Sequence, residues 1–104
     1  MAAALSPDQC LTMIDVRDGV DAVDTQLIDL LATRFAYMRA AARIKSDRAM
    51  VRDESRKTAV IAAAREQAES HQLPGEAIAS LWNALVEVSI SYELEEWDRR
   101  HSTN

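Results

Sequence analysis

MIDVRDGVDAVDTQLIDLLATRFAYMRAAARIKS, residues 13–46, decides the fold of this chain of 104 residues. The stretch contains no proline, and its apolar side chains recur at intervals of three and four residues, the period of one amphipathic helix. The sequence therefore predicts a single long helix from about Thr12 to Ser46. The apolar stripe of this helix consists of Val16, Val20, Val23, Leu27, Leu30, Tyr37, Ala41 and Ile44.

Three cations, Arg17, Arg34 and Lys45, lie in or beside this apolar stripe. A cation on a buried face loses its hydration unless an anion meets it. Arg34 and Lys45 are 11 residues apart, which corresponds to about 16 Å of helical rise and about 20° of rotation, so both can reach one small anionic ligand. Arg17 precedes Arg34 by 17 residues, or about 25 Å, so it can serve such a site only on another chain.

The length of the helix also predicts a second chain. A helix over residues 13–46 would be about 50 Å long, whereas a compact domain of this size has a radius of gyration of about 13 Å. The exposed apolar stripe is most simply buried against the same stripe of a second copy. We therefore predict an intertwined, two-fold homodimer with two equivalent pockets.

Composition favours an all-α fold and disfavours several kinds of partner. The chain contains two glycines and 48% apolar residues, and no alternating pattern suggests a strand. The net charge of −5 disfavours a nucleic-acid or membrane surface as partner.

No signal peptide or membrane span is evident, so we expect a cytoplasmic protein. Cys10 has no second cysteine to pair with and is interpreted as inert.

Two shorter helices are predicted after the long one. Asp53 is a plausible N-cap for a helix over residues 54–70. Its alanine-rich stripe, suited to packing against the first helix, consists of Val60, Ala63, Ala64 and Gln67. Pro74 fits the first turn of a third helix that ends at about Arg100. The stripe of this helix consists of Ile78, Leu81, Trp82, Leu85, Val88 and Tyr92, with Trp97 near its end.

The predicted domain covers residues 12–101. Residues 1–11 form a flexible leader in which Ser6 or Asp8 can start a helical turn. Residues 102–104 form a tail without a defined structure.

Two further groups complete the candidate site. Arg56 lies in the first turn of the second helix, near the connection that follows Lys45, and is a candidate fourth cation. Ser89 and Glu93 are four residues apart on one face of the third helix and could present a hydroxyl and a carboxyl together. The histidines, His71 and His101, show no metal-ligand spacing.

Each of these residues also has a structural explanation. The aliphatic stems of Arg34 and Lys45 could cover the apolar stripe while their charged heads reach water. Arg17 could pair with Asp21, and Arg56 could pair with Asp53 or Glu54. Glu93 on its own resembles one more acid of a solvated run. Only the group of four cations favours a pocket for an anion.

Several landmarks in this order resemble the all-helical chorismate mutases and the closely related isochorismate-pyruvate lyases, over about residues 13–97. The landmarks are Asp15-Val16-Arg17, the step from Asp21 to Asp24, Arg34, Ala42-Arg43-Ile44-Lys45, Val51-Arg52-Asp53 with Arg56, and Ser89 with Glu93. The resemblance implies three helices per chain in an intertwined homodimer, with each pocket completed by an arginine of the partner.

The resemblance also implies the roles of individual residues. Arg34, Arg56 and Arg17 of the partner subunit would hold the two carboxylates of chorismate, while Lys45 and Glu93 would address its ether oxygen. The implied catalytic residues are Lys45, Glu93 and Arg34. The implied substrate-binding residues are Arg17, Arg34, Lys45, Asp53, Arg56, Ser89 and Glu93.

The implied reaction is the Claisen rearrangement of chorismate to prephenate, which needs no nucleophile and no cofactor. The protein selects the compact diaxial conformer and places positive charge where the breaking C–O bond leaves negative charge on oxygen. This chemistry explains why the chain offers cations without a catalytic dyad.

Two positions depart from the mutase pattern. Glu93 stands where many mutases carry glutamine, and a carboxyl group donates a hydrogen bond only when it is protonated. Lys57 stands where many mutases carry a glutamate that accepts from the ring hydroxyl, and an ammonium group cannot accept. We predict a chorismate mutase, with isochorismate-pyruvate lyase or a non-catalytic helical dimerisation module as alternatives.

Overall fold

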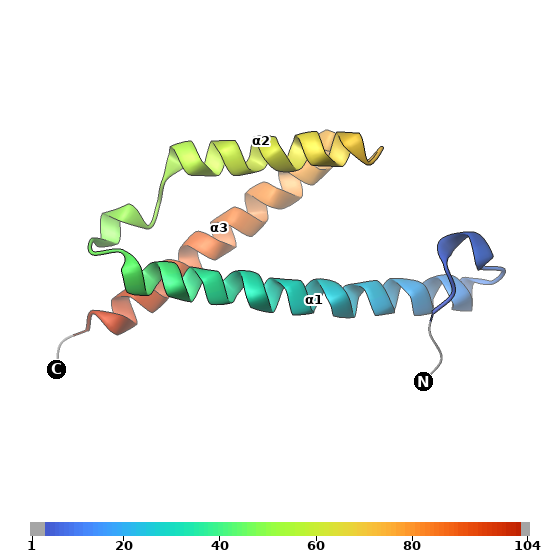
Figure 1. Cartoon of the computed structure of the whole chain (residues 1–104), viewed down its shortest axis with the longest axis horizontal. Helices are drawn as coiled ribbons and strands as arrows, with labels where there is room; N and C mark the ends of the chain where they lie inside the picture. Colours follow the sequence, from blue (N-terminus) through green and yellow to red (C-terminus); the bar gives the residue numbers. More distant parts are fainter. Residues whose placement is uncertain (1–3, 103–104) are drawn as a thin grey trace. The chain divides into compact units, whose positions relative to one another are not determined.

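A computed structural model describes residues 4–102, and every regular element among them is helical (Figure 1). The elements are the short 3₁₀ helix η1 (Pro7–Gln9), α1 (Met13–Ile44), the 3₁₀ helix η2 (Arg48–Met50), α2 (Glu54–Ser70) and α3 (Gly75–Arg100). The predicted all-α fold with three helices and a very long first helix is confirmed. No helix among the described residues has the length and apolar character that a membrane crossing requires.

The predicted helix boundaries agree with the structure to within two residues. The second helix begins and ends as predicted, and the Asp53 side chain accepts a hydrogen bond from the Arg56 backbone N–H at 3.0 Å, as an N-cap does. The first helix ends at Ile44 instead of Ser46, because the Asp47 side chain accepts from the Ala49 N–H and starts η2 instead.

The two ends of the chain are described in part. Ser6 is the N-cap of η1 and thus starts a helical turn, one of the two possibilities that the sequence predicted. Residues 1–3 of the predicted leader and residues 103–104 of the predicted tail lie outside the described residues.

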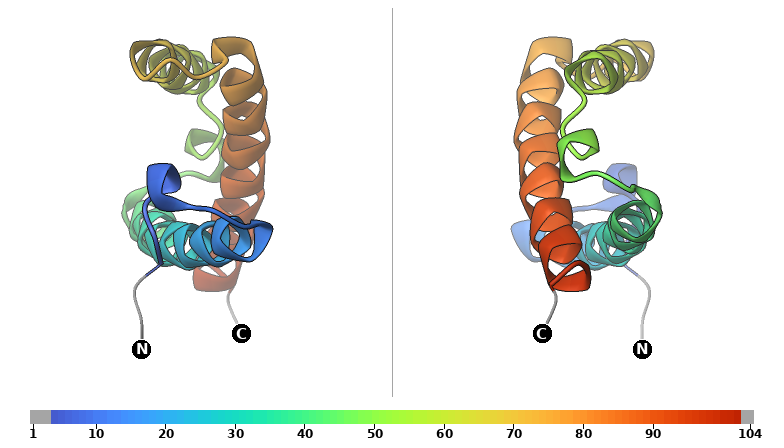
Figure 2. Two further views of the ribbon diagram at one scale, coloured as in Figure 1. Left: turned by 90° about the vertical axis from the view of Figure 1, so that its right-hand side faces the viewer. Right: turned by 90° about the vertical axis from the view of Figure 1, so that its left-hand side faces the viewer.

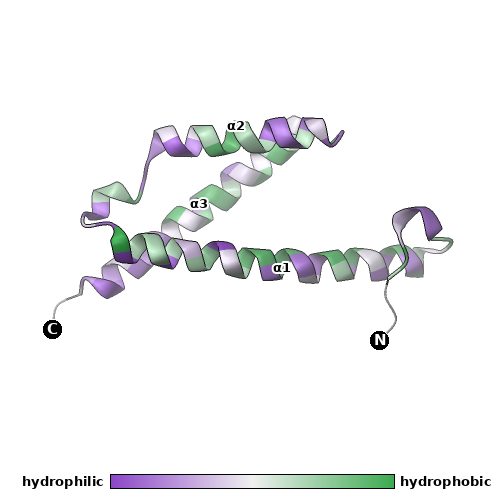
Figure 3. Cartoon of the chain, viewed as in Figure 1, coloured by the Kyte–Doolittle hydropathy of each residue, from purple (hydrophilic) through white to green (hydrophobic). Residues whose placement is uncertain are grey.

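The chain divides into two compact units inside α1, and each is considered by itself. The first unit ends at Ala36 and the second begins at Tyr37. Apolar and polar residues alternate in bands along α1 (Figure 3). Large apolar side chains of the first unit are exposed in the single chain, a pattern that marks an interaction surface. On α1 they are Met13, Ile14, Val16, Val20, Val23, Leu27, Ile28 and Leu30.

The second unit contains the core. Helix α2 packs against α3, and η2 lies beside α3, as both views in Figure 2 agree. The buried cluster consists of Val51, Val86 and Ile90, with Val60, Leu94 and Trp97 packed against it. Val51 follows η2 directly, so its burial against Val86 and Ile90 holds the connection between α1 and α2 against α3.

In the single chain, two of the predicted stripes are only partly buried. On α2, Ala64 and Ala68 are buried while Ala63 and Gln67 are exposed, and the packing partner in the second unit is α3 rather than the first helix. The buried residues of α3 are Gly75, Ala79, Val86, Ser89, Ile90 and Glu93. Leu81 of the predicted stripe is exposed. Helix α3 is apolar on two faces, and periodicity alone does not select between them.

The connection between α2 and α3 is a tight helix end. The Leu73 N–H donates to the Ala68 carbonyl at 2.9 Å and the Gln72 N–H donates to the Glu69 carbonyl at 3.1 Å, which together form a Schellman motif. Gln72 has a φ of 58°, the left-handed conformation that this motif requires. The motif lets α3 begin four residues after His71 and fold back onto α2.

Candidate active site

The predicted site residues are divided between the two units. Arg17 and Arg34 lie on α1 in the first unit, where Arg17 is exposed and Arg34 is half-buried. The predicted residues of the second unit are Lys45, Asp53, Arg56, Ser89 and Glu93. Within residues 4–102 no ion pair forms between Arg17 and Asp21, so the structural explanation offered for Arg17 is not realised.

Lys45 and Glu93 form the central contact of the second unit. Lys45 Nζ donates to Glu93 Oε2 at 2.7 Å, and the Glu93 residue is only 4% exposed. The Lys45 side chain remains 26% exposed. The interpretation of Glu93 as a solvated surface acid is therefore wrong. An ammonium with two further N–H donors beside a buried carboxyl is suited to binding an oxygen of a ligand.

The end of α1 places Lys45 for this contact. Lys45 is the first residue beyond the helix, yet its N–H still donates to the Ala41 carbonyl at 2.9 Å. Its own carbonyl accepts a hydrogen bond from the indole Nε1 of Trp97 at 3.0 Å. The helical register therefore continues through Lys45, as the spacing argument requires.

Ser89 and Glu93 lie one turn apart and are both buried, with Ser89 only 3% exposed. The hydroxyl of Ser89 donates to the Leu85 carbonyl at 2.7 Å, a bond within the helix that satisfies the donor. Their shared burial in α3 confirms that they lie on one face, whereas their contact with a ligand stays a prediction.

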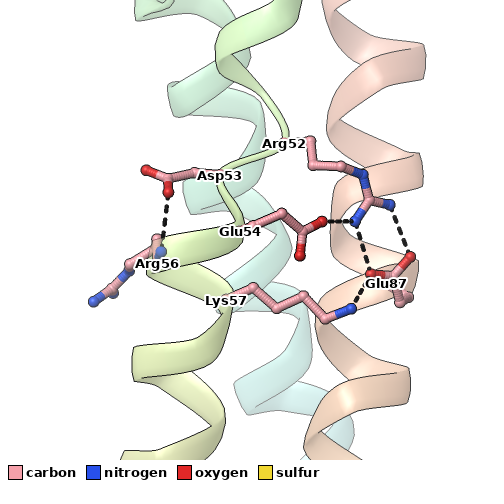
Figure 4. A network of polar contacts seen from close by, with 6 residues as sticks. All are labelled: Arg52, Asp53, Glu54, Arg56, Lys57 and Glu87. Atoms are coloured by element: carbon pink, nitrogen blue, oxygen red, sulfur yellow. Dashed lines mark hydrogen bonds and ion pairs between the residues drawn. The ribbon is translucent and has the colours of Figure 1, made fainter.

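The first turn of α2 presents Arg56 (Figure 4). The Asp53 carboxylate caps the helix, and the Glu54 carboxylate accepts from Arg52 Nη1 at 2.8 Å. Neither carboxylate pairs with the Arg56 guanidinium, which extends away from the Lys57 side chain. The structural explanation offered for Arg56 is thus not realised, and its exposed guanidinium is available to an anion.

Lys57, the position that departs from the mutase pattern, binds Glu87 of α3. Lys57 Nζ donates to Glu87 Oε2 at 2.6 Å, and Arg52 donates to the two oxygens of the same carboxylate at 3.0 and 2.8 Å (Figure 4). Hydrogen bonds from Arg52 and then from Lys57 lower the pKa of the Glu87 carboxyl to about 2. Lys57 therefore serves here to hold the start of α2 against α3.

The ion pairs of Glu87 with Arg52 and Lys57, called the ion-pair node below, should affect stability at low pH. Because the folded-state pKa of Glu87 lies near 2 and its ordinary value is 4.5, its ionised carboxylate stabilises the fold above about pH 4.5, and this contribution is lost as the pH falls toward 2. We expect Glu87→Gln to lower the urea midpoint at neutral pH, with the difference from wild type closing between about pH 4.5 and 2.

Glu76→Gln provides a matched control, because Glu76 also bridges α3 to α2 through Arg65 at 2.8 Å but is 85% exposed. It should lose less stability, since exposed pairs are well screened by water. Equal losses in the two variants, or a difference from wild type that does not depend on pH, would contradict this account of the node.

Several contacts around the site were missed by the sequence analysis. Arg39 Nη1 donates to the Tyr92 hydroxyl at 2.9 Å, and Arg48 forms two hydrogen bonds with Asp98 at 2.8 and 3.2 Å. These pairs join residues about 50 positions apart, which no local pattern reveals. Trp97, by contrast, lies four residues after Glu93, and that i, i+4 spacing could have linked it to Lys45.

A hollow of the first unit is lined by none of the predicted site residues. It has a volume of about 980 Å³ and lies between the leader and α1. Apolar side chains such as Leu5, Val16, Val20 and Val23 line it. Nothing in this lining supplies a charged group for a dicarboxylate, so we assign it no catalytic role.

Comparisons with known proteins identify the family of this chain. The sequence profile of the family described as chorismate mutase type II matches residues 16–94. The chain is also similar to an isochorismate pyruvate lyase of Pseudomonas aeruginosa, with 24% identity over 92 residues that cover 88% of this chain and 91% of the relative. The family match spans all three helices and contains every predicted site residue, so this chain is a member of the chorismate mutase type II family.

Proposed function

We propose that this protein is a chorismate mutase that converts chorismate to prephenate. The observation that carries the proposal is the pair of Lys45 with the buried Glu93 at 2.7 Å, in a chain of the chorismate mutase type II family. An ammonium fixed beside a second polar group is what the ether oxygen of chorismate needs, because negative charge develops on that oxygen as the C–O bond breaks.

The mechanism follows from the charges that converge on the substrate. In the bound diaxial conformer the two reacting carbons are in contact, so the new C–C bond forms as the C–O bond breaks within one molecule. Lys45 donates one of its free N–H bonds to the ether oxygen, and protonated Glu93 donates a second hydrogen bond. No proton has to be transferred and no covalent intermediate forms.

Binding of the substrate's carboxylates is assigned to three arginines in a homodimer. Arg34 and Arg56 would come from one chain and Arg17 from the partner subunit. Two observations support this assembly: the apolar stripe of α1 is exposed in the single chain, with Leu27 at 50% exposure, and the Arg17 guanidinium makes no ion pair among residues 4–102. Asp53 and Ser89 would contribute further contacts. We also expect a cytoplasmic location, where chorismate as a small polar metabolite would be accessible to the enzyme.

The second candidate is an isochorismate-pyruvate lyase, which two observations favour. The relative from Pseudomonas aeruginosa carries that name. In addition, Lys57 replaces the acceptor that many mutases use for the ring hydroxyl, and its ammonium is bound to Glu87. The deciding experiment offers purified protein chorismate and isochorismate separately. Prephenate from chorismate supports the mutase, salicylate and pyruvate from isochorismate support the lyase, and turnover of neither rejects both.

The role of Glu93 predicts the effect of a conservative substitution. Glu93→Gln keeps an oxygen that accepts from Lys45 and supplies an amide N–H that can donate to the ether oxygen. If Glu93 donates to that oxygen, we expect Glu93→Gln to retain at least the kcat of wild type. A large loss of kcat in a folded Glu93→Gln protein would refute this role for Glu93.

A further inference from the structure

Lys45 is held at both ends by a single turn of α3. Its ammonium donates to Glu93 Oε2 at 2.7 Å, and its backbone carbonyl accepts from the Trp97 indole N–H at 3.0 Å. Glu93 and Trp97 are four residues apart, so their side chains project from the same face of the helix. One helical turn therefore fixes both the backbone and the charged group of the same lysine.

The indole bond lies where the backbone lacks a helical partner. The carbonyls at the C-terminal end of a helix have no N–H groups following them in the helix, and α1 ends at Ile44, immediately before Lys45. The Trp97 N–H satisfies the Lys45 carbonyl in place of the missing turn. The direction in which the chain leaves α1, and hence the start of the Lys45 side chain, is thereby set from α3.

The indole itself is held firmly on several sides. The ring packs against the buried cluster of Val51, Val86 and Ile90. The His101 imidazole stacks on it with ring centroids 3.7 Å apart and an interplanar angle of 12°. The neighbouring Asp98 holds Arg48 at the far end of the same connection. A donor fixed in this way can hold the carbonyl that it binds.

We propose that Trp97 is a positioning residue for Lys45, because its indole N–H holds the lysine backbone where the ammonium meets both Glu93 and the substrate's ether oxygen. This inference rests on the proposed function, in which Lys45 stabilises charge on that oxygen. A lysine side chain has four flexible carbons, so the position of its backbone decides whether the ammonium is already in place before the substrate arrives. The cost of losing Trp97 should appear in kcat rather than in KM.

The test compares two substitutions on the same helix. Trp97→Phe retains an aromatic ring for the core and for His101 but removes the N–H donor. Trp82→Phe is the matched control, because Trp82 is also half-buried in α3 and its indole makes no hydrogen bond among residues 4–102. We expect Trp97→Phe to lower kcat about tenfold with KM changed less than about twofold, and Trp82→Phe to change neither.

A double-mutant cycle separates positioning from a general structural role. If Trp97 acts through Lys45, adding Trp97→Phe to Lys45→Ala should cause no further loss of kcat, whereas a general weakening of the fold would lower it by the same factor in both backgrounds. Equal factors in both backgrounds, or a normal kcat for Trp97→Phe in an active protein, would overturn the positioning role alone. Absence of turnover of chorismate and isochorismate by wild type would instead reject the proposed function, and the positioning role with it.

A measurement on the unaltered chain guards against a variant that fails to fold. The two indole N–H signals in a ¹H–¹⁵N spectrum belong to Trp82 and Trp97. We expect the Trp97 indole proton to exchange with water at least tenfold more slowly, because it is hydrogen-bonded and partly buried. Exchange at the Trp82 rate would show that the contact does not persist in solution and would reject the inference without any mutation.

Discussion

Lys45→Ala is expected to lower kcat by about 10²–10³-fold, the usual effect of removing one preorganised donor to a developing oxyanion. In the proposed mechanism the Lys45 ammonium contacts the oxygen on which charge develops in the transition state, and no other cation forms an ion pair with Glu93 among the described residues of the second unit. Because this interaction strengthens as the bond breaks, the loss should fall on kcat more than on KM. The measurement is steady-state conversion of chorismate to prephenate.

Two controls make this result interpretable. Arg43→Ala removes an exposed cation from the last turn of α1 and should leave kcat within about twofold of wild type, because no charged side chain is paired with it among residues 4–102. Lys45→Ala also leaves the buried Glu93 without its partner, which destabilises the fold. Lys45→Ala combined with Glu93→Gln replaces the unpartnered carboxyl group with a neutral amide and should restore stability without restoring turnover. A folded Lys45→Ala protein with normal kcat would favour a non-catalytic dimerisation module instead.

The fold could be predicted from the sequence because its main signals are local. The three- and four-residue period of the stretch up to Ile44 identifies the long helix without any tertiary information. Asp53 is recognisable as an N-cap by its place before Glu54, and its carboxylate does accept from the first turn. These features depend on neighbours within four residues, so sequence reasoning describes them well.

The buried faces and the contacts between helices could not be predicted in the same way. Periodicity identified Leu81 as part of the α3 stripe, yet it is exposed, because α3 is apolar on two faces and packing against α2 uses the other one. Glu93 resembles a surface acid beside Glu95 and Glu96, and only its contact with Lys45, 48 residues away, explains why it is buried. Its proximity to Lys45 was implied by the family resemblance alone and is consistent with the structure.

The role of Lys57 illustrates a further limit of pattern reasoning. The sequence marks Lys57 as a departure from the mutases, because a lysine cannot accept a hydrogen bond. It does not reveal that Glu87 lies opposite and takes the Lys57 ammonium at 2.6 Å. A substitution that looks like a change in substrate recognition is, in the free chain, part of an ion-pair node that holds two helices together.

Mixing two inactive variants is expected to restore activity if Arg17 acts across the dimer. In the proposed dimer each pocket takes Lys45 from one chain and Arg17 from the partner subunit. In a heterodimer of an Arg17→Ala chain with a Lys45→Ala chain, one pocket carries both defects and the other carries none. With random pairing of equal amounts, half of the dimers are mixed, so the unfractionated preparation should recover about a quarter of the wild-type activity per chain, and isolated heterodimers about half.

The matched control mixes Lys45→Ala with Arg56→Ala. Both residues belong to the second unit, and the proposed pocket takes both from the same chain, so every pocket of that heterodimer carries one defect and no activity should return. The measurement is prephenate formation after co-expression with two different affinity tags, on heterodimers isolated by sequential purification. Recovery in the first mixture alone supports an arginine contributed by the partner subunit. Equal recovery in both mixtures, or none in either, is incompatible with it, because the restoration depends on Arg17 and Lys45 meeting from different chains.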